Sequence, residues 1–263
     1  MAVPESGTKA PGYGSQLVAV VGPGLAQLVR PPQASHKQEA AQRLVRQLFA
    51  LSGMTIGLML LLMFTFDVTA IQSMPPRGTP GLWPVRIFTD FGKDEYVLGI
   101  LAAALILVVL AVPLRPQGSR SRLLHLGTHL QYLFLAVLIP ILCAQPLKWI
   151  IGRGRPFVGG KANAFNFQPF NGTEAYFSLP SAHAVTAFAL AFAMAAVWPR
   201  LRMPMYLYAV AIALSRLVLL AHHPSDVVGG ALVGLIGAML VRYWFAARQL
   251  GFAVGEGGQI VPR

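Results

Sequence analysis

Six long apolar stretches constrain the fold of this chain more than any other feature. They lie at residues 48–68, 96–114, 124–147, 181–198, 204–221 and 225–246. Each is close to the roughly 17–25 residues that a helix needs to cross the hydrocarbon core of a bilayer. The stretches are continuously apolar rather than alternating, which argues against membrane-spanning strands. The sequence therefore predicts an all-α membrane protein, a bundle of six transmembrane helices.

The charged residues indicate how this bundle is inserted. Only 11% of the residues are charged, against about 25% in an average soluble domain, as expected for a membrane protein. If the N-terminus is cytoplasmic, the inner segments hold 13 Lys and Arg residues but only three acidic residues. Basic residues favour the cytoplasmic side of a membrane. Both termini are therefore predicted to be cytoplasmic, in a multi-pass protein of the cell (inner) membrane.

The segments outside the spans divide the chain into three parts. Residues 1–47 are predicted to form a cytoplasmic N-terminal segment, a flexible Gly- and Pro-rich tail followed by a helix-forming stretch at the inner surface. Residues 48–246 form the membrane domain and residues 247–263 a cytoplasmic tail. Within the membrane domain, residues 69–95 carry prolines and aromatic residues and are predicted to cap the outer interface. The net charge of +12 is explained by the Lys and Arg residues predicted on the cytoplasmic side. It therefore does not indicate nucleic-acid binding, and nucleic acid is not an expected partner.

Small residues in the last apolar stretch indicate close helix packing. The stretch contains Gly229, Gly230, Gly234 and Gly237. Glycines spaced in this way allow two helices to approach closely in lipid. We expect these contacts to lie within the chain rather than between two copies of it.

Three short polar clusters lie where apolar stretches begin or end. The clusters are Lys148 with Arg155-Pro156, then Pro180-Ser181-Ala182-His183, then Ser215-Arg216 with His222 and Asp226. Ionisable groups at the edge of a membrane are costly, so they indicate a functional site. Following the spans from a cytoplasmic N-terminus places all three clusters at the outer ends of helices. We therefore expect them to form one site on the outer face.

The cationic residues of these clusters favour a phosphate group as the ligand. Lys148, Arg155 and Arg216 concentrate positive charge in a region with few acids. Guanidinium groups match phosphate oxygens with paired donors, whereas Lys acts as a point charge. Ser181 fits the N-cap of one helix and Pro224 the first position of the last one, and free N–H groups at such helix starts also favour an anion.

Two glycines indicate that the helix breaks after Lys148. Gly152 and Gly154 make a continuous helix from Lys148 to Arg155 unfavourable.

The two histidines of the clusters suggest covalent catalysis at this phosphate. His222 can attack phosphorus as a nucleophile if Asp226, four residues later, accepts the other N–H of its ring. His183 can then protonate the departing oxygen. The scheme requires no metal and no other cofactor.

The three clusters resemble the signature of the type 2 phosphatidic acid phosphatase superfamily, which also includes glucose-6-phosphatase and the vanadium haloperoxidases. That signature reads Lys-x6-Arg-Pro, Pro-Ser-Gly-His and Ser-Arg-x5-His-x3-Asp, and the spacing matches in all three parts. Residues 124–246 carry the resemblance. One residue departs from the signature, because Ala182 stands where the family has Gly. Alanine keeps the backbone N–H but adds a methyl group, so we expect a small local adjustment.

The resemblance implies an activity and a set of roles. The expected reaction is metal-independent hydrolysis of a phosphomonoester or diphosphate on a membrane lipid, through a phosphohistidine, on the periplasmic side. His222 would be the nucleophile, Asp226 its orienting partner and His183 the acid. The phosphate would be held by Lys148, Arg155, Ser181, Ala182 and Arg216. Polyprenyl diphosphate, phosphatidate, phosphatidylglycerol phosphate and a lipid A phosphate all fit as the lipid partner.

Other interpretations of the same residues stay open. A lipid phosphotransferase would use the same phosphohistidine, and an anion or lipid transporter would use the same cations without a nucleophile. His222, the adjacent His223 and Asp226 are also types that bind a metal, although the neighbouring cations oppose this. Arg153 and Lys161 fit either contacts to a lipid headgroup or ordinary loop charges.

Overall fold

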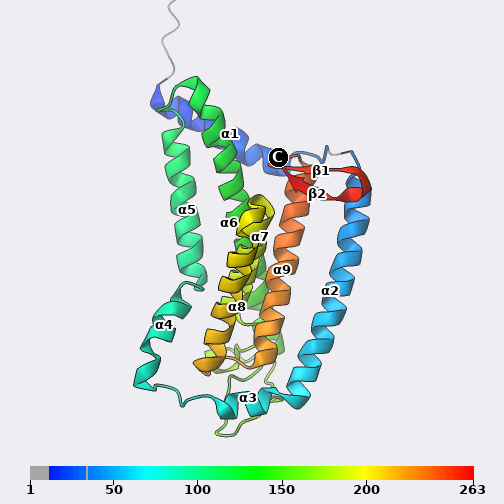
Figure 1. Cartoon of the computed structure of the whole chain (residues 1–263). Helices are drawn as coiled ribbons and strands as arrows, with labels where there is room; N and C mark the ends of the chain where they lie inside the picture. Colours follow the sequence, from blue (N-terminus) through cyan, green and yellow to red (C-terminus); the bar gives the residue numbers. More distant parts are fainter. Residues whose placement is uncertain (1–11, 34) are drawn as a thin grey trace, which may run out of the picture.

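The computed structural model describes residues 12–33 and 35–263, and most of these residues are helical (Figure 1). The elements are α1 (Tyr13–Val29), α2 (Lys37–Thr65), α3 (Asp67–Ser73), η1 (Pro80–Leu82), α4 (Trp83–Asp90), α5 (Asp94–Ala111), α6 (Gln117–Ile151), η2 (Glu174–Tyr176), α7 (Ala182–Val197), η3 (Pro199–Leu201), α8 (Arg202–Val218), α9 (Pro224–Ala247), β1 (Phe252–Val254), η4 (Glu256–Gly258) and β2 (Ile260–Pro262). The predicted all-α class is confirmed, with one small hairpin of strands added near the C-terminus.

Five helical stretches in the described part of the chain are long and apolar enough to cross a membrane. They are α2, the stretch Pro80–Ala111 that includes α5, α6, the stretch Pro199–Val218 that includes α8, and α9. The remaining predicted span corresponds to α7, which is apolar but has only 16 residues. At about 1.5 Å per residue, α7 is about 24 Å long. The structure thus supports five spans by length, and α7 is a shorter helix enclosed by the others.

Helix α9 lies inside the bundle, where it packs against α2, α6 and α7. Its glycines make this packing possible. A Cβ atom at Gly230 or Gly234 would collide with carbonyl oxygens of Ser181 or Val185, and one at Gly237 would collide with Pro140 of α6. The expectation that these glycines serve contacts within the chain is confirmed.

Helix α1 and the C-terminus lie at the same end of the bundle (Figure 1). There the structure differs from the flexible tail that we expected, because Tyr13–Val29 is the helix α1. The Trp244 indole donates a hydrogen bond to Leu28 O (3.0 Å), so contact with α9 stabilises a segment whose own sequence is a poor helix former. The β1–β2 hairpin, in the expected C-terminal tail, buries Phe252 against Tyr132 of α6. Residues 1–11 of the predicted tail lie outside the described residues.

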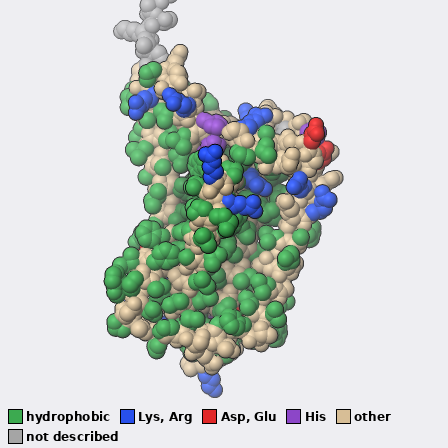
Figure 2. Space-filling view, viewed as in Figure 1, with side chains coloured by type: hydrophobic (Ala, Val, Ile, Leu, Met, Phe, Trp, Pro, Cys, Tyr) green, Lys and Arg blue, Asp and Glu red, His purple; other side chains and the backbone are tan. Residues whose placement is uncertain are grey.

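Exposed charge gathers at this end of the molecule. Figure 2 shows Lys, Arg and His side chains around the end that carries α1 and the C-terminus, above a wide hydrophobic surface. At the opposite end, two of the basic side chains are buried instead, with Lys148 8% exposed and Arg153 fully enclosed. Buried cations need polar partners, so this second end is where a site is expected.

Candidate functional site

The end of helix α6 places Lys148 and Arg155 on the same side of the bundle. Gly152 ends the helix in a left-handed conformation (φ 58°), and its N–H closes the last turn on Lys148 O. A side chain at Gly152 would collide with the carbonyl of Gln168, so the position requires glycine. The predicted break after Lys148 is confirmed, and the chain continues into the loop that carries Arg155.

The starts of α7 and α9 are joined directly. Ser181 is the N-cap residue of α7 and Pro224 is the first residue of α9, as the sequence predicts. The Ser181 N–H donates to Asp226 O (3.1 Å), which fixes one helix start against the other. Ala182 opens α7 beside them and His183 follows it. All three polar clusters therefore reach one end of the bundle.

Several polar atoms of the predicted site residues are buried without a hydrogen-bond partner among the described residues. These atoms are Nε of Arg155, Oγ of Ser181, Nε2 of His183, Nε of Arg216 and Nδ1 of His222. Leaving one such atom unpaired costs about 1–3 kcal/mol, and native structures contain few of them. Similar atoms occur elsewhere among the described residues, on Arg30 and Arg242 for example, but the five named here belong to the motif residues and together give a polar ligand donors and acceptors to bind.

The electrostatic surroundings keep His222 uncharged. This residue lies in the loop between α8 and α9 and is 4% exposed. Burial, together with the positive charges of Arg216 and Arg155, lowers the pKa of His222 to about 4, although Asp226 acts in the opposite direction. The imidazole is therefore neutral near pH 7, and a neutral ring nitrogen has the lone pair that a nucleophile needs.

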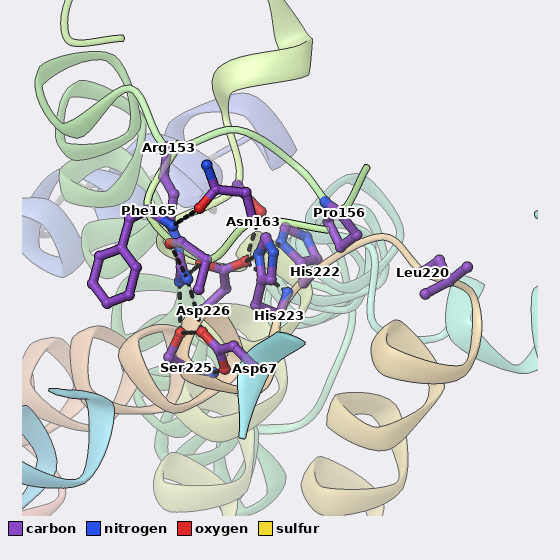
Figure 3. A network of polar contacts seen from close by, with 12 residues as sticks. Asp67, Arg153, Pro156, Asn163, Phe165, Leu220, His222, His223, Ser225 and Asp226 are labelled. Atoms are coloured by element: carbon purple, nitrogen blue, oxygen red, sulfur yellow. Dashed lines mark hydrogen bonds and ion pairs between the residues drawn. The ribbon is translucent and has the colours of Figure 1, made fainter. Parts of the chain in front are cut away.

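Asp226 contacts His223 more closely than His222 (Figure 3). The distance from Asp226 Oδ2 is 3.8 Å to His222 Nδ1 but 3.2 Å to His223 Nδ1. The same oxygen accepts hydrogen bonds from the His223 N–H (2.7 Å) and from Ser178 Oγ (2.6 Å). The expected hydrogen bond from the His222 ring to Asp226 is thus absent in this conformation, because other donors occupy the oxygen. The role of Asp226 as partner of His222 stays a prediction.

Arg153 has neither of the two roles that the sequence suggested for it. Its side chain is fully buried, so it is neither a headgroup contact nor an ordinary loop charge. It forms ion pairs with Asp226 (2.6 Å) and with Asp67 at the start of α3 (2.7 Å) (Figure 3). Sequence reasoning missed Asp67, although an acid at the end of the first apolar stretch was a signal. Lys161, in contrast, is exposed.

Two further residues, both between α3 and α5, contact the clusters. Thr89 of α4 accepts hydrogen bonds from Arg216 Nη1 (3.0 Å) and from Ser215 Oγ (2.9 Å). Arg77 donates through Nε and Nη2 to Leu220 O (3.0 and 2.6 Å). Residues 69–95 are thus largely helical and contact the site.

Arg77 connects two of the clusters. Its Nη2 also donates to Pro156 O (3.1 Å), in the first cluster. Its other acceptor, Leu220, has a left-handed backbone (φ 52°) that non-glycine residues rarely adopt. Burial and the nearby charge of Arg155 lower the pKa of Arg77. The loop that leads to His222 is therefore held by a residue that no motif identifies.

Comparisons with known proteins identify the family of this chain. Residues 129–250 match the model of a family described as the PAP2 superfamily. The chain is 30% identical over 205 residues to a lipid A 1-phosphatase of Rhizobium etli, covering 78% of this chain and 88% of the relative. It is 29% identical over 208 residues to a lipid A 1-phosphatase of Rhizobium johnstonii, covering 78% of this chain and 83% of that protein. No solved structure matches the chain significantly.

Proposed function

The chain belongs to the PAP2 superfamily, the type 2 phosphatidic acid phosphatases, and from this premise we propose that it hydrolyses a phosphate ester of a membrane lipid at the site formed by the three clusters. The observation that supports this site best is the group of buried, unpaired polar atoms on Arg155, Ser181, His183 and Arg216. The relatives are named lipid A 1-phosphatases, so the 1-phosphate of lipid A is our first candidate substrate.

The proposed reaction has two steps. In the first, Nε2 of His222 attacks phosphorus, an N–P bond forms, and the bond from phosphorus to the lipid oxygen breaks. His183 gives its proton to that oxygen, and the lipid leaves as an alcohol. In the second step, water attacks the phosphohistidine and loses a proton to His183. The N–P bond breaks, inorganic phosphate leaves, and both histidines return to their starting states.

The surrounding groups would stabilise the charges of both steps. Lys148, Arg155 and Arg216 would face the phosphate oxygens, where charge accumulates in the transition state. Ser181 Oγ and the N–H of Ala182 would add neutral donors at the start of α7. Asp226 would stabilise the positive imidazole of His222. The cations supply the positive charge that a metal would otherwise bring, so the proposed reaction uses none.

The proposed orientation in the membrane follows from the exposed charges. Lys and Arg are concentrated at the end that carries α1 and the C-terminus, which favours a cytoplasmic position for that end (Figure 2). The site would then open at the periplasmic face of the inner membrane. A lipid could present its phosphate there while its acyl chains stay in the outer leaflet.

Phosphate release from a panel of lipids tests the proposal. We expect the detergent-purified protein to release inorganic phosphate from lipid A 1-phosphate faster than from phosphatidate, phosphatidylglycerol phosphate or polyprenyl diphosphate. His222→Ala should abolish release. His125→Ala removes an exposed histidine of α6 and is the matched control. Absence of release from every lipid, or full activity of His222→Ala, would contradict the proposal.

A further inference from the structure

A buried group of three charges joins helix α3 to the start of α9. Asp67 is the first residue of α3, Arg153 lies in the loop after α6, and Asp226 is in the first turn of α9. All three side chains have no exposed surface. Arg153 Nη2 lies 2.7 Å from Asp67 Oδ2, and Arg153 Nη1 lies 2.6 Å from Asp226 Oδ1 (Figure 3). One guanidinium group therefore connects two carboxylates.

Arg153 has no donor left for a substrate. Besides its two ion pairs, it donates to Ala164 O from Nε (3.1 Å) and from Nη2 (2.8 Å), and to Ser225 Oγ from Nη1 (2.6 Å). Together with the two ion pairs, these contacts account for all five N–H groups of a guanidinium. Its function is therefore to hold other residues.

Asp67 also holds the backbone next to Asp226. Its Oδ1 accepts a hydrogen bond from the Ser225 N–H (3.0 Å), and its Oδ2 accepts one from the Ser225 hydroxyl. Ser225 is the neighbour of Asp226 and lies three residues after His222. One carboxylate thus fixes both the first turn of α9 and the guanidinium that contacts Asp226.

The charge of Asp67 matters as much as its hydrogen bonds. With two carboxylates and one guanidinium, the group carries one net negative charge. Without Asp67, Arg153 would neutralise Asp226 completely. A phosphohistidine mechanism puts positive charge on the His222 ring, 3.8 Å from Asp226, and a net negative charge stabilises that state in a buried site.

We propose that Asp67 is a positioning residue for phosphoryl transfer, which keeps Asp226 oriented and negatively charged beside His222 by holding Arg153 and Ser225. The inference rests on the proposed function, because it takes His222 as the nucleophile. Asp67 lies outside residues 129–250, the part of the chain that matches the family model. No hydrogen bond or ion pair joins it to Lys148, Arg155 or Arg216 among the contacts of the described residues, so its effect should fall on the chemical step.

Asp67→Asn tests this role, because it keeps the size of the side chain and removes its charge. We expect kcat to fall at least tenfold. KM, and the constant for competitive inhibition by inorganic phosphate, should change less than about threefold, because the phosphate-binding residues are untouched. Glu95→Gln is the matched control, since it neutralises an exposed carboxylate of α5 and should leave all three constants unchanged.

Two outcomes would overturn the inference. One is a kcat within twofold of wild type in folded Asp67→Asn protein, and the other is a loss of kcat accompanied by an equal rise in KM and in the inhibition constant. If Asp67→Asn does not fold, Ser225→Ala decides the question. A lower kcat at unchanged KM supports the inference, and wild-type kcat contradicts it. If His222→Ala abolishes activity but Asp67→Asn behaves as wild type, the proposed function stands and only this inference fails.

Discussion

At the scale of single residues, the site depends on polar contacts that reach it from outside the three clusters. Arg216 has one hydrogen bond that sets its direction, from Nη1 to Thr89 Oγ1 (3.0 Å). Its Nε is buried and has no hydrogen-bond partner among the described residues, so this donor is available to a ligand. A guanidinium group binds an oxyanion well only when its plane is fixed, because its donors are arranged in a rigid fork. In the proposed reaction, Thr89 would therefore support phosphate binding by fixing Arg216, without touching the substrate.

Thr89→Val should weaken phosphate binding. The change preserves shape but removes the acceptor of Arg216 and Ser215, so we expect KM, and the inhibition constant of inorganic phosphate, to rise roughly fivefold or more, equivalent to ~1 kcal/mol or more. Steady-state kinetics in detergent measure both constants. Thr128→Val is the control, because Thr128 bonds only its own helix, at Leu124 O (3.1 Å). Unchanged binding in Thr89→Val would refute this role.

The pKa of His222 gives a prediction about pH. Because this pKa is lowered to about 4, the folded protein takes up the His222 proton only near that pH, whereas the unfolded chain takes it up near 6.5. The contribution of His222 to stability is therefore complete above about pH 6.5 and is lost as the pH falls towards about 4. NMR titration of labelled histidine, assigned with His222→Ala, measures the midpoint. A midpoint at or above 6.5 would contradict the prediction.

At the scale of elements, the features that the sequence predicts are those determined by residues close together in the chain. The apolar stretches identify the helices, and the capping positions Ser181 and Pro224 identify where α7 and α9 begin. Gly152 marks the end of α6 for the same local reason. These predictions succeed because helix ends are determined within one or two turns.

The rest of the site depends on contacts between segments that are distant in the sequence. The pattern of apolar residues along the chain carries no information about such contacts. Arg153 and Asp67 are 86 positions apart, and their pairing follows only from how α3 lies against the loop after α6. Helix α1 was not predicted for a similar reason, because it is stabilised by tertiary contacts rather than by the helix propensity of its own residues. Whether His222 or His223 lies closer to Asp226 is decided by a difference in distance of less than an ångström, which the spacing of residues in the sequence cannot resolve.

The contact between α7 and α9 should not tolerate a larger residue. A Cβ at Gly230 would lie 2.5 Å from Ser181 O and 2.8 Å from the Ala184 Cβ. Gly230→Ala should therefore reduce the free energy of unfolding by about 1–3 kcal/mol, as is typical of overpacking. Gly99→Ala in α5, where no atom lies within 4 Å, should be neutral or slightly stabilising. Equal thermal midpoints for the two variants in detergent would show that the close approach is unimportant.

At the scale of the whole molecule, charge is divided between the two ends of the bundle. Many exposed Lys and Arg side chains surround the end that carries α1 and the C-terminus, whereas at the other end Lys148 and Arg153 are buried, and Arg155 and Arg216 carry buried atoms without a partner among the described residues (Figure 2). The first arrangement suits anchoring at a membrane surface, and the second suits binding an anion. A phosphatase that acts on a lipid needs both properties. It must stay at a fixed position in the bilayer, and it must bind the lipid phosphate in a polar site.

Trapping of a covalent intermediate tests the central claim, that residues from separate helices act on one phosphoryl group. Wild-type protein should be mixed with lipid substrate labelled in its phosphate, quenched within the first turnovers and digested. We predict acid-labile, base-stable phosphate on the peptide that contains His222, and none in His222→Ala. Label on a different residue, or turnover without any covalent phosphate on His222, would contradict the account.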